Sequence, residues 1–282
     1  MQLSGVRQEL PQPCPFKPGV CTKEGGVCSI RLYQRQPNGE VSVVPGYDGM
    51  LRATCPFRFH EGGLLVSWIG ERLLSHPSPR VVKEVGFLKP LPTIGRRPVS
   101  TQRGSQQERE IGRIDMILVH PEFRMQLQWC GVEMQAVYFS GYAMSNEFRA
   151  IALHQNETIP FPAANHRPDY RSSGPKRLLP QLQIKVRDIS RWGKRMAVVV
   201  DRGFFDALAR MRFEGDISNA DIAWFVVRFQ EDESTTARLT LDEVYYTRLE
   251  DAVQGLTGGK ALTQAEFEAR IREKLGLDPG AV

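Results

Sequence analysis

The sequence lacks the local motifs that mark several large enzyme classes. No G-x-S-x-G elbow and no G-x-G-x-x-G loop occurs, which argues against acyl transfer and against dinucleotide binding. The five histidines form no H-x-x-x-H pair, so a zinc hydrolase centre of that type is not expected. A P-loop and internal repeats are absent as well. The functional residues must therefore come from distant parts of the chain that the fold brings together.

Long apolar runs and a strong charge excess are also missing. No run of 18 or more apolar residues occurs, so the sequence predicts no transmembrane helix and no membrane partner. The first ten residues lack the apolar centre of a signal peptide, and we therefore expect a reducing, cytoplasmic location. The formal charge of +5 over 282 residues is compatible with a polyanionic partner but is too small to identify one.

Cysteine is scarce and unevenly distributed. Four of the five cysteines lie within the first 55 residues, as Cys14, Cys21, Cys28 and Cys55. Clustered thiols in a reducing compartment bind a metal more often than they form disulfides, so these four predict one tetrahedrally bound metal ion. The alternative is a set of unrelated buried cysteines, because the spacing is not a paired C-x-x-C. Cys130, the fifth, is expected to be a small buried hydrophobe.

Two carboxylates and an amide fall in short apolar segments that we expect to be neighbouring strands. Asp115 precedes the apolar stretch 116–119, while Glu133 and Gln135 alternate with apolar residues and therefore share a face. Asp115 and Glu133 are separated by 17 residues, and the pattern Asp…Glu-x-Gln matches a PD-(D/E)XK nuclease core in which Gln135 replaces the usual lysine. Such carboxylates would hold Mg²⁺. The alternatives are a solvated strand end and a structural ion pair.

Several motifs, in the same order, resemble the NotI restriction endonuclease family. They are PCPFKPGVC, GGVCSIRLY, LRATCPFRF, KEVGFL, EIGRIDMIL and CGVEMQAVYFSG, and the resemblance spans roughly residues 10–230. It implies a homodimeric type II restriction endonuclease that cuts both strands of DNA with Mg²⁺. It also implies that Asp115, Glu133 and Gln135 form the catalytic core and that the four N-terminal cysteines hold a structural metal, which is iron in that family.

A further acid from an upstream helix usually joins a core of this kind. Glu84, in VVKEVGFL, is the best match in this sequence. Glu110 competes for the role, because a long polar and proline-rich stretch separates Glu84 from Asp115. Both residues therefore remain candidates at this point.

Composition divides the chain into two expected domains. Residues 1–60 are rich in Gly, Pro and Cys, so we expect a small module that depends on its metal for folding free energy. A hairpin with a turn at Pro37-Asn38-Gly39 could bring Cys28 and Cys55 to one end of this module. Residues 61–282 are expected to form an α/β endonuclease domain with a mixed central sheet flanked by helices.

Apolar patterns predict the elements of this second domain. Leu65, Trp68 and Ile69 have helical spacing, and Pro77 ends that helix. A strand over 196–201 runs into a helix, two more strands follow at 220–230 and 238–247, and a T-x-x-E capping box at Thr263 begins the last helix. Asp201 and Asp206 could form a second metal site, but a capping role is favoured.

Two basic and proline-containing stretches are candidates for DNA contact. Residues 90–109 and 156–187 are both expected to be irregular loops, and their alternative is a solvated connection with dispersed charge. Arginine suits both phosphate and guanine edges. The candidate DNA-binding residues are Arg96, Arg97, Arg103, Arg167, Arg171, Lys176 and Arg177, with Arg109, Asn165 and His166 nearby.

The sequence therefore favours Mg²⁺-dependent, site-specific cleavage of double-stranded DNA. Asp115 and Glu133 would hold the ion, and Gln135 would orient water or polarise the phosphate. A cognate DNA methyltransferase is the expected genetic partner. The alternatives are a non-catalytic DNA-binding protein with vestigial acids and a repair or defence nuclease that has the same core.

Overall fold

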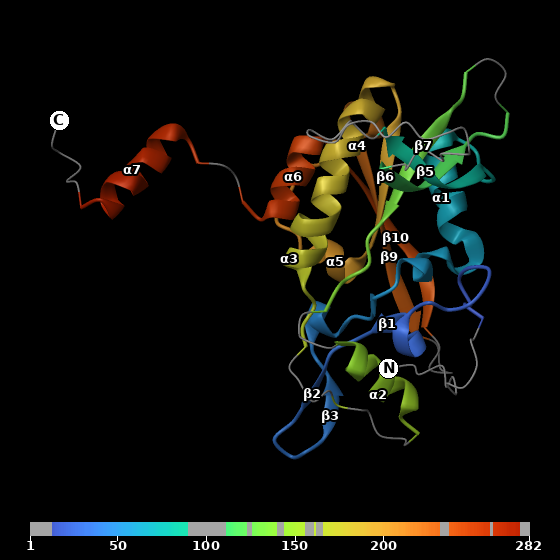
Figure 1. The fold of residues 1–282 in the computed structure, drawn as a ribbon, viewed down its shortest axis with the longest axis vertical. Helices are drawn as coiled ribbons and strands as arrows, with labels where there is room; N and C mark the ends of the chain where they lie inside the picture. The colour runs from blue at the N-terminus through green and yellow to red at the C-terminus, as the bar shows by residue number, and fades with distance from the viewer. Residues whose placement is uncertain are drawn as a thin grey trace, which may run out of the picture.

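The protein is described by a computed structural model whose centre is one mixed β-sheet (Figure 1). The described residues are 13–89, 111–122, 126–139, 144–155, 161, 166–231, 237–259 and 262–276. Several residues that carried predictions lie outside these ranges, namely Arg96, Arg97, Arg103, Arg109, Glu110 and Asn165. The core of the sheet and the helices that cover it fall within them.

The central sheet has six strands in the order β10-β9-β8-β7-β6-β5. Neighbours β7, β8 and β9 run parallel, whereas the β5–β6, β6–β7 and β9–β10 pairs are antiparallel. The strands are β5 Arg80–Leu88, β6 Ile111–Val119, β7 Trp129–Met134, β8 Arg195–Asp201, β9 Ile222–Glu231 and β10 Ala237–Thr247. The predicted mixed α/β architecture is confirmed.

Strand β8 and the first six residues of β9 are buried on both faces, which explains their continuous apolar sequences. Along β8, Val198 and Val200 belong to a hydrophobic cluster on one face, whereas Ala197 and Val199 belong to a cluster on the other. This alternation is the period of two that a pleated strand imposes on its side chains. The sheet is therefore the middle layer of a three-layer domain.

Helices cover the two faces of the sheet (Figure 1). Apolar side chains of α4 (Leu179–Arg191), α5 (Arg202–Asp206) and α6 (Leu249–Thr257) pack in the cluster that contains Val198. The other face is covered by α1 (Leu64–Leu74), which buries Leu65, Trp68 and Ile69 as their spacing predicted. The helix ends before Pro77, also as predicted.

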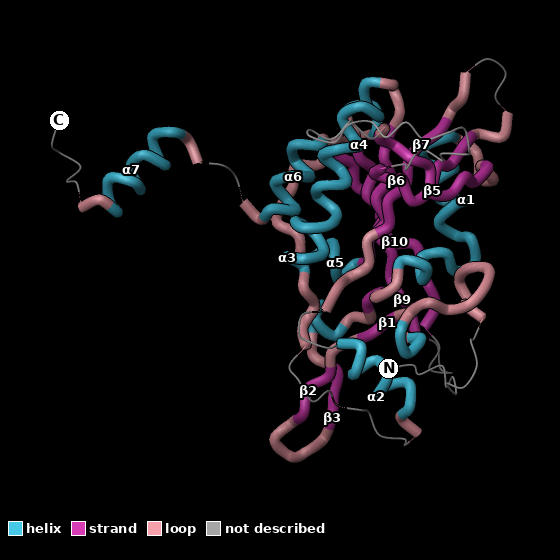
Figure 2. Tube along the Cα trace, in the orientation of Figure 1, coloured by secondary structure: helices cyan, strands magenta, loops and turns pink. Residues whose placement is uncertain are grey.

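The N-terminal part is built from short elements at one end of the sheet (Figure 2). They are η1 Glu24–Gly26, β1 Ser29–Ile30, β2 Tyr33–Arg35, β3 Val41–Val43, η2 Gly46–Gly49, β4 Arg52–Ala53 and η3 Pro56–Gly63. The β2–β3 hairpin is confirmed, but it does not join the two thiols as expected. Antiparallel β1 and β4 do so, since the Thr54 amide donates to the Cys28 carbonyl at 2.9 Å.

Contacts across residue 60 tie this N-terminal part to the rest of the chain. The Ala53 amide donates to Asp201 Oδ2 at 2.9 Å, and Arg52 is fully buried with its Nε 2.7 Å from the Tyr170 hydroxyl. Helix α2 (Met144–Leu153) packs on η1, where a Cβ at Gly25 would lie 2.3 Å from the Phe148 carbonyl oxygen. A domain boundary at residue 60 stays a prediction.

The expectation of an irregular loop over 156–187 is wrong for its second half. Residues 170–191 form a helical run of α3 (Tyr170–Ser173), the π-helical turn η4 (Gly174–Leu178) and α4. Leu178, Leu182 and Val186 recur every four residues and bury their side chains against the sheet. Two prolines suggested a loop, yet each stands in the first turn of its segment, where a missing amide hydrogen is tolerated.

The C-terminal elements follow the sequence patterns closely. Strands β8, β9 and β10 lie where they were predicted, and η5 (Ile217–Asn219) connects within this unit. The Thr263–Glu266 capping box begins α7 (Gln264–Lys274), which lies apart from the sheet in Figure 2. Among the described helices, none has the length and apolar character required to cross a membrane.

Candidate active site

The register of three strands aligns three carboxylates. Lys83 and Val85 of β5 pair with Met116 and Ile114 of β6, so Glu84 stands opposite Asp115. Met116 pairs with Val132 of β7, and one position further along, Asp115 stands opposite Glu133. Residues opposite one another on adjacent strands are close neighbours. We call Glu84, Asp115 and Glu133 the acidic row.

Asp115 is the central and least compensated member of the acidic row. Its Oδ2 accepts a hydrogen bond from the Met134 amide at 2.9 Å, and the side chain remains accessible to solvent. Desolvation by the surrounding protein nevertheless raises its pKa, and the charge of Glu84 adds to that rise, while Lys185 opposes it. Within the described residues, no basic side chain forms an ion pair with Asp115.

Glu133 is buried and paired with a lysine from a helix. Its pairing with Val198 of β8 turns it toward the face that α4 covers. There the Lys185 ammonium lies 2.6 Å from Glu133 Oε1, and both side chains are almost completely buried. Burial raises the pKa of Glu133 to about 7, with a further contribution from Asp115, even though Lys185 acts in the opposite direction.

Glu84 occupies the outer end of the acidic row in a strained backbone conformation. Its φ of 51° lies in the left-handed region, which non-glycine residues adopt at a cost of about 1–3 kcal/mol. The side chain is exposed and forms a 3.0 Å ion pair with Arg113. Strain of this kind concentrates at functional sites. The structure thus places Glu84 opposite Asp115, on a strand instead of a helix, and its role in the site stays a prediction.

Gln135 lies just beyond the end of β7. The Gln135 backbone N–H donates to the Val199 carbonyl at 3.0 Å, so the chain remains hydrogen-bonded to β8 beyond the end of β7. The side-chain Nε2 donates to the neighbouring Ala136 carbonyl at 2.5 Å. The side-chain amide of Gln135, two residues after Glu133, is therefore hydrogen-bonded to its own neighbour in the chain.

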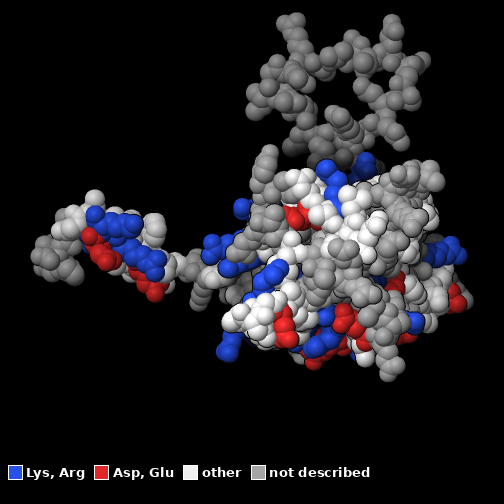
Figure 3. Space-filling view, turned by 90° about the horizontal axis from the view of Figure 1, so that it is seen from below, with Lys and Arg blue, Asp and Glu red and all other residues white. Residues whose placement is uncertain are grey.

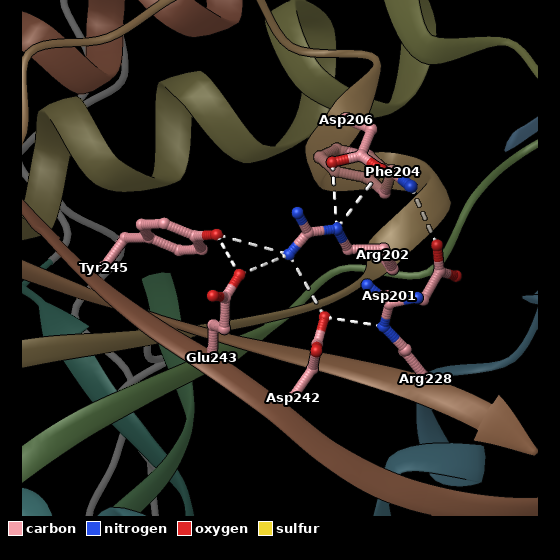
Figure 4. A network of polar contacts seen from close by, with 8 residues as sticks. All are labelled: Asp201, Arg202, Phe204, Asp206, Arg228, Asp242, Glu243 and Tyr245. Carbon is pink, nitrogen blue, oxygen red and sulfur yellow. Dashed lines mark hydrogen bonds and ion pairs between the residues drawn. The ribbon is translucent and has the colours of Figure 1, made fainter.

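A second group of acids, at the β9–β10 edge, has the character of a structural cluster (Figure 4). Arg202 forms ion pairs with Asp206, Asp242 and Glu243 at 3.0, 3.1 and 2.8 Å. Arg228 pairs with Asp242, and Tyr245 hydrogen-bonds to Glu243. We call these six residues the Arg202 cluster. Asp201 beside it caps α5 by accepting the Phe204 amide, as the capping interpretation predicted.

The four N-terminal thiols are gathered but do not form a recognisable metal cage. All are free; Cys55 is buried, and the other three are partly buried. Burial raises the pKa of Cys28 to about 12, and the proximity of the thiols of Cys55, Cys21 and Cys14 adds to that rise. Among the described residues, no group of three or more His, Cys, Asp or Glu side chains has an arrangement that could hold a metal ion. This applies both to the thiols and to the acidic row.

Comparison with known families decides the identity of the chain. A family profile described as Restriction endonuclease NotI matches residues 2–241, which is most of the sequence. The chain belongs to the NotI restriction endonuclease family. It is a type II site-specific deoxyribonuclease, and DNA is its substrate. No curated protein matches the chain.

Membership in the NotI family makes the alternative of a non-catalytic DNA-binding protein untenable. The match ends within β10, so α6 and α7 lie beyond it. The acidic row, the thiols and the basic residues discussed below all lie within it. The parts of the chain that carry the predicted chemistry are therefore those that relate it to the endonuclease family.

The basic residues predicted to contact DNA are only partly brought together. Arg171, Lys176 and Arg177 are exposed on the α3–η4 run, and the Arg177 guanidinium lies 3.6 Å from the centre of the Tyr138 ring. Arg167 is a few residues away and has interactions of its own. Figure 3 shows basic and acidic side chains interspersed on the face that it presents, in keeping with the small net charge. Arg171, Lys176 and Arg177, which we call the basic patch, are therefore a local group of basic side chains and not part of a strongly basic surface.

Sequence reasoning missed Lys185 altogether. The stretch that contains it was interpreted as an irregular basic loop, so its charge was counted with the solvated ones. A signal was nevertheless present, because Leu182, Val186 and Ile189 mark an apolar helical face on which Lys185 also falls. A lysine in the middle of a buried helical face is rare unless it has a partner. That spacing, taken as a helix, would have pointed to a buried acid.

Proposed function

We propose that this endonuclease cleaves DNA with Mg²⁺ at the acidic row, in the manner of a PD-(D/E)XK enzyme. The observation that carries the proposal is the alignment of Glu84, Asp115 and Glu133 on three adjacent strands, with Asp115 accessible to solvent and without a basic partner among the described residues. Hard cations such as Mg²⁺ prefer carboxylate oxygens, so the donor types suit this ion, although the described side chains are not arranged in advance as a three-ligand group and would have to close on the ion.

Each residue of the site has a distinct part in this proposal. Asp115 and Glu133 would hold the ion, and Glu84 would complete the acidic surface; Glu110 remains an alternative for this third role. When bound, Mg²⁺ supplies activation of water and neutralisation of charge on the phosphate. Gln135 would donate an amide hydrogen to the water or to a phosphate oxygen. It carries no charge and cannot deliver a proton as a lysine can.

DNA would approach the acidic row along the basic patch. Arg171, Lys176 and Arg177 are available for phosphate contacts that position the duplex, while sequence is read at base edges. Tyr138, which stacks with Arg177, lies three residues after Gln135 and so links the patch to the end of β7. Arg96, Arg97, Arg103 and Arg167 remain candidates for further contacts.

We further propose the assembly and partners that the family implies. Cutting both strands of a palindrome requires two active sites related by the two-fold symmetry of the DNA, which a homodimer provides. A DNA methyltransferase would protect the same sites in the host, and the enzyme would act in the cytoplasm. A repair or defence nuclease with the same core would instead cut without a fixed sequence, so the ends of its products would differ.

Cys14, Cys21, Cys28 and Cys55 are proposed as ligands of a structural iron or zinc ion. Their support is chemical: four free thiols lie within electrostatic range of one another at one end of the β1–β4 pair. Tetrahedral thiolate sites suit both metals. Elemental analysis should find one such ion per chain, and Cys21→Ala should release it. A metal-free protein whose melting temperature is unchanged by Cys21→Ala would contradict this assignment.

The cleavage proposal is tested by sequencing DNA ends. Unmethylated genomic DNA should be incubated with the protein in Mg²⁺ and, in parallel, in Ca²⁺, which often supports binding without hydrolysis. The expected result is a set of ends that share one palindromic sequence, produced in Mg²⁺ only. Ends scattered over unrelated sequences would favour the repair or defence nuclease, and equal cutting after chelation of divalent ions would contradict the proposal.

A further inference from the structure

Lys185 connects α4 to two of the three strands of the acidic row, β6 and β7. It is completely buried, and its ammonium donates to Glu133 Oε1 on β7 at 2.6 Å and to the Arg113 carbonyl on β6. Arg113 is two residues before Asp115, so one ammonium group joins the strands that carry Asp115 and Glu133 from the helix side of the sheet. No surface role is open to a side chain that solvent does not reach.

The helix holds this ammonium group in place. Leu182, Val186 and Ile189, on either side of Lys185, are fully buried in the hydrophobic cluster against the sheet. A lysine anchored in such packing cannot swing out to water without disturbing the core. Its position relative to β6 and β7 is therefore as fixed as the packing of α4 itself.

We propose that Lys185 is a positioning residue of the active site: it supplies from α4 the cation that the strand position of Gln135 lacks, and it orients Glu133 for metal binding. This inference rests on the cleavage function proposed above. Lys185 engages Glu133 Oε1, and a hydrogen bond from the Asp115 backbone also reaches this carboxylate, so its orientation is fixed and only its remaining lone pairs are open to a ligand. A glutamate without such a partner would lose side-chain conformational entropy when the ion bound. Because Lys185 already fixes the Glu133 side chain, this entropy cost does not reduce the affinity for the ion.

A structural ion pair is the competing interpretation, and it makes different predictions. Removing one partner of a buried pair usually lowers the stability of the fold, because the other charge is left without compensation, whereas loss of an orientation function would lower metal affinity in protein that still folds. Lys185→Met keeps the length of the side chain and removes the ammonium group. Lys185→Gln keeps a hydrogen-bond donor without the charge, and it serves if the methionine variant does not fold. The matched control is Lys194→Met, because the Lys194 ammonium also donates to a backbone carbonyl, that of Leu127 at 2.7 Å.

The first measurement is Mn²⁺ binding by calorimetry, without DNA and therefore without any reaction. We expect Lys185→Met to weaken Mn²⁺ binding at least fivefold and Lys194→Met to leave it within twofold of wild type. At saturating Mg²⁺, kcat for DNA cleavage should fall at least a hundredfold in Lys185→Met, while binding of uncleaved DNA in Ca²⁺ stays within threefold. Adding Gln135→Lys to the Lys185→Met protein places a cation on the strand, and the double variant should have a kcat at least tenfold higher than Lys185→Met alone.

Two outcomes would overturn the inference. One is a folded Lys185→Met or Lys185→Gln protein with wild-type Mn²⁺ affinity, whatever its rate of cleavage. The other is a loss of cleavage that Gln135→Lys does not restore at all. Asp115→Asn separates these failures from a failure of the proposed function. If the Asp115→Asn protein cuts at the wild-type rate, the active site has been assigned to the wrong residues. If Asp115→Asn is inactive and Lys185→Met is active, only the role of Lys185 is wrong.

Discussion

The acidic row and the Arg202 cluster have the same inventory of charges and different arrangements. The row combines its three carboxylates with Lys185 and Arg113, and the cluster combines Asp206, Asp242 and Glu243 with two arginines. Every acid of the cluster has a direct ion pair, whereas Asp115 of the row has none among the described residues. Composition alone therefore does not distinguish an acid that stabilises the fold from one that is available for chemistry.

The pKa shifts in the two places have opposite directions. The hydrogen bond from Tyr245, followed by Arg202, lowers the pKa of Glu243 below its usual range. Desolvation raises the pKa of Asp115 and of Glu133, and their basic neighbours only partly offset it. Perturbed acids of the second kind are characteristic of functional sites. A cation that binds among them would replace the compensation that the protein leaves incomplete.

The largest difference should appear when one acid of each kind is neutralised. Asp115→Asn or Glu133→Gln should lower the rate of DNA cleavage in Mg²⁺ by about a hundred- to a thousandfold, as expected when a group that organises charge at the reaction is lost. Asp242→Asn should leave the rate per folded molecule within twofold. Single-turnover cleavage of DNA, with folded fractions from circular dichroism, measures both.

Binding provides the control for that experiment. Asp115→Asn should bind uncleaved DNA in Ca²⁺ at least as tightly as wild type, since it removes a negative charge that faces phosphate. Equal loss of cleavage in Asp115→Asn and Asp242→Asn would show that the row and the cluster are not different in function.

The free energy of unfolding should depend on the Arg202 cluster more than on the acidic row, the reverse of the order expected for cleavage. Arg202→Ala leaves three carboxylates without their shared cation, in a group that is only partly exposed, and should lower the free energy of unfolding by about 2 kcal/mol. Asp115→Asn should leave this free energy unchanged or raise it, because it relieves repulsion within the row. Urea denaturation measures both changes. A row variant that is less stable than Arg202→Ala would contradict the assignment of the row to function.

Asp201 is an acid of a third kind, buried and satisfied by backbone amides of Ala53 and Phe204. Burial raises its pKa from 3.8 to about 6, so the folded state binds a proton more tightly than the unfolded chain. The stability from this group is complete below the unfolded pKa and is lost as pH rises through the folded pKa. Relative to Asp201→Asn, wild type should gain about 1 kcal/mol between pH 7 and pH 5. If urea denaturation gives wild type and Asp201→Asn the same change in the free energy of unfolding between pH 7 and pH 5, this prediction is wrong.

The smallest effects are expected from surface charges that belong to neither group. Arg177→Ala should weaken DNA binding by about threefold and reduce the slope of log K against log salt by about one, as for a single phosphate contact. The cleavage rate of bound DNA should not change. Lys274→Ala on α7, beyond the residues that match the family, is the control and should alter neither quantity. An unchanged salt slope in Arg177→Ala would remove this residue from the DNA-binding patch.

Much of the sheet and of the acidic row could be predicted from sequence. Strands with continuous apolar runs are easily recognised, and Asp115 and Glu133 were expected on neighbouring strands because both adjoin such runs. The adjacency of Glu84 was less evident, since it depends on pairing across a long connection. It became visible only when β5 and β6 were seen in register.

The two failures have different causes. Two-residue strands such as β1 and β4 have too few side chains to show a period, so the pairing that unites Cys28 and Cys55 was attributed to the β2–β3 hairpin. In residues 170–191 the prolines and basic residues were given more weight than the four-residue recurrence of leucine and valine. That choice concealed α4 and, with it, Lys185.

The central claim is that the acidic row, and not any other acidic group, holds the catalytic ion. Mn²⁺ binding to wild type, Asp115→Asn and Asp242→Asn, measured by calorimetry without DNA, tests it most directly. We expect Asp115→Asn to lose the tightest Mn²⁺ site that wild type shows and Asp242→Asn to retain it. An Asp115→Asn protein that binds Mn²⁺ as wild type does would contradict the account.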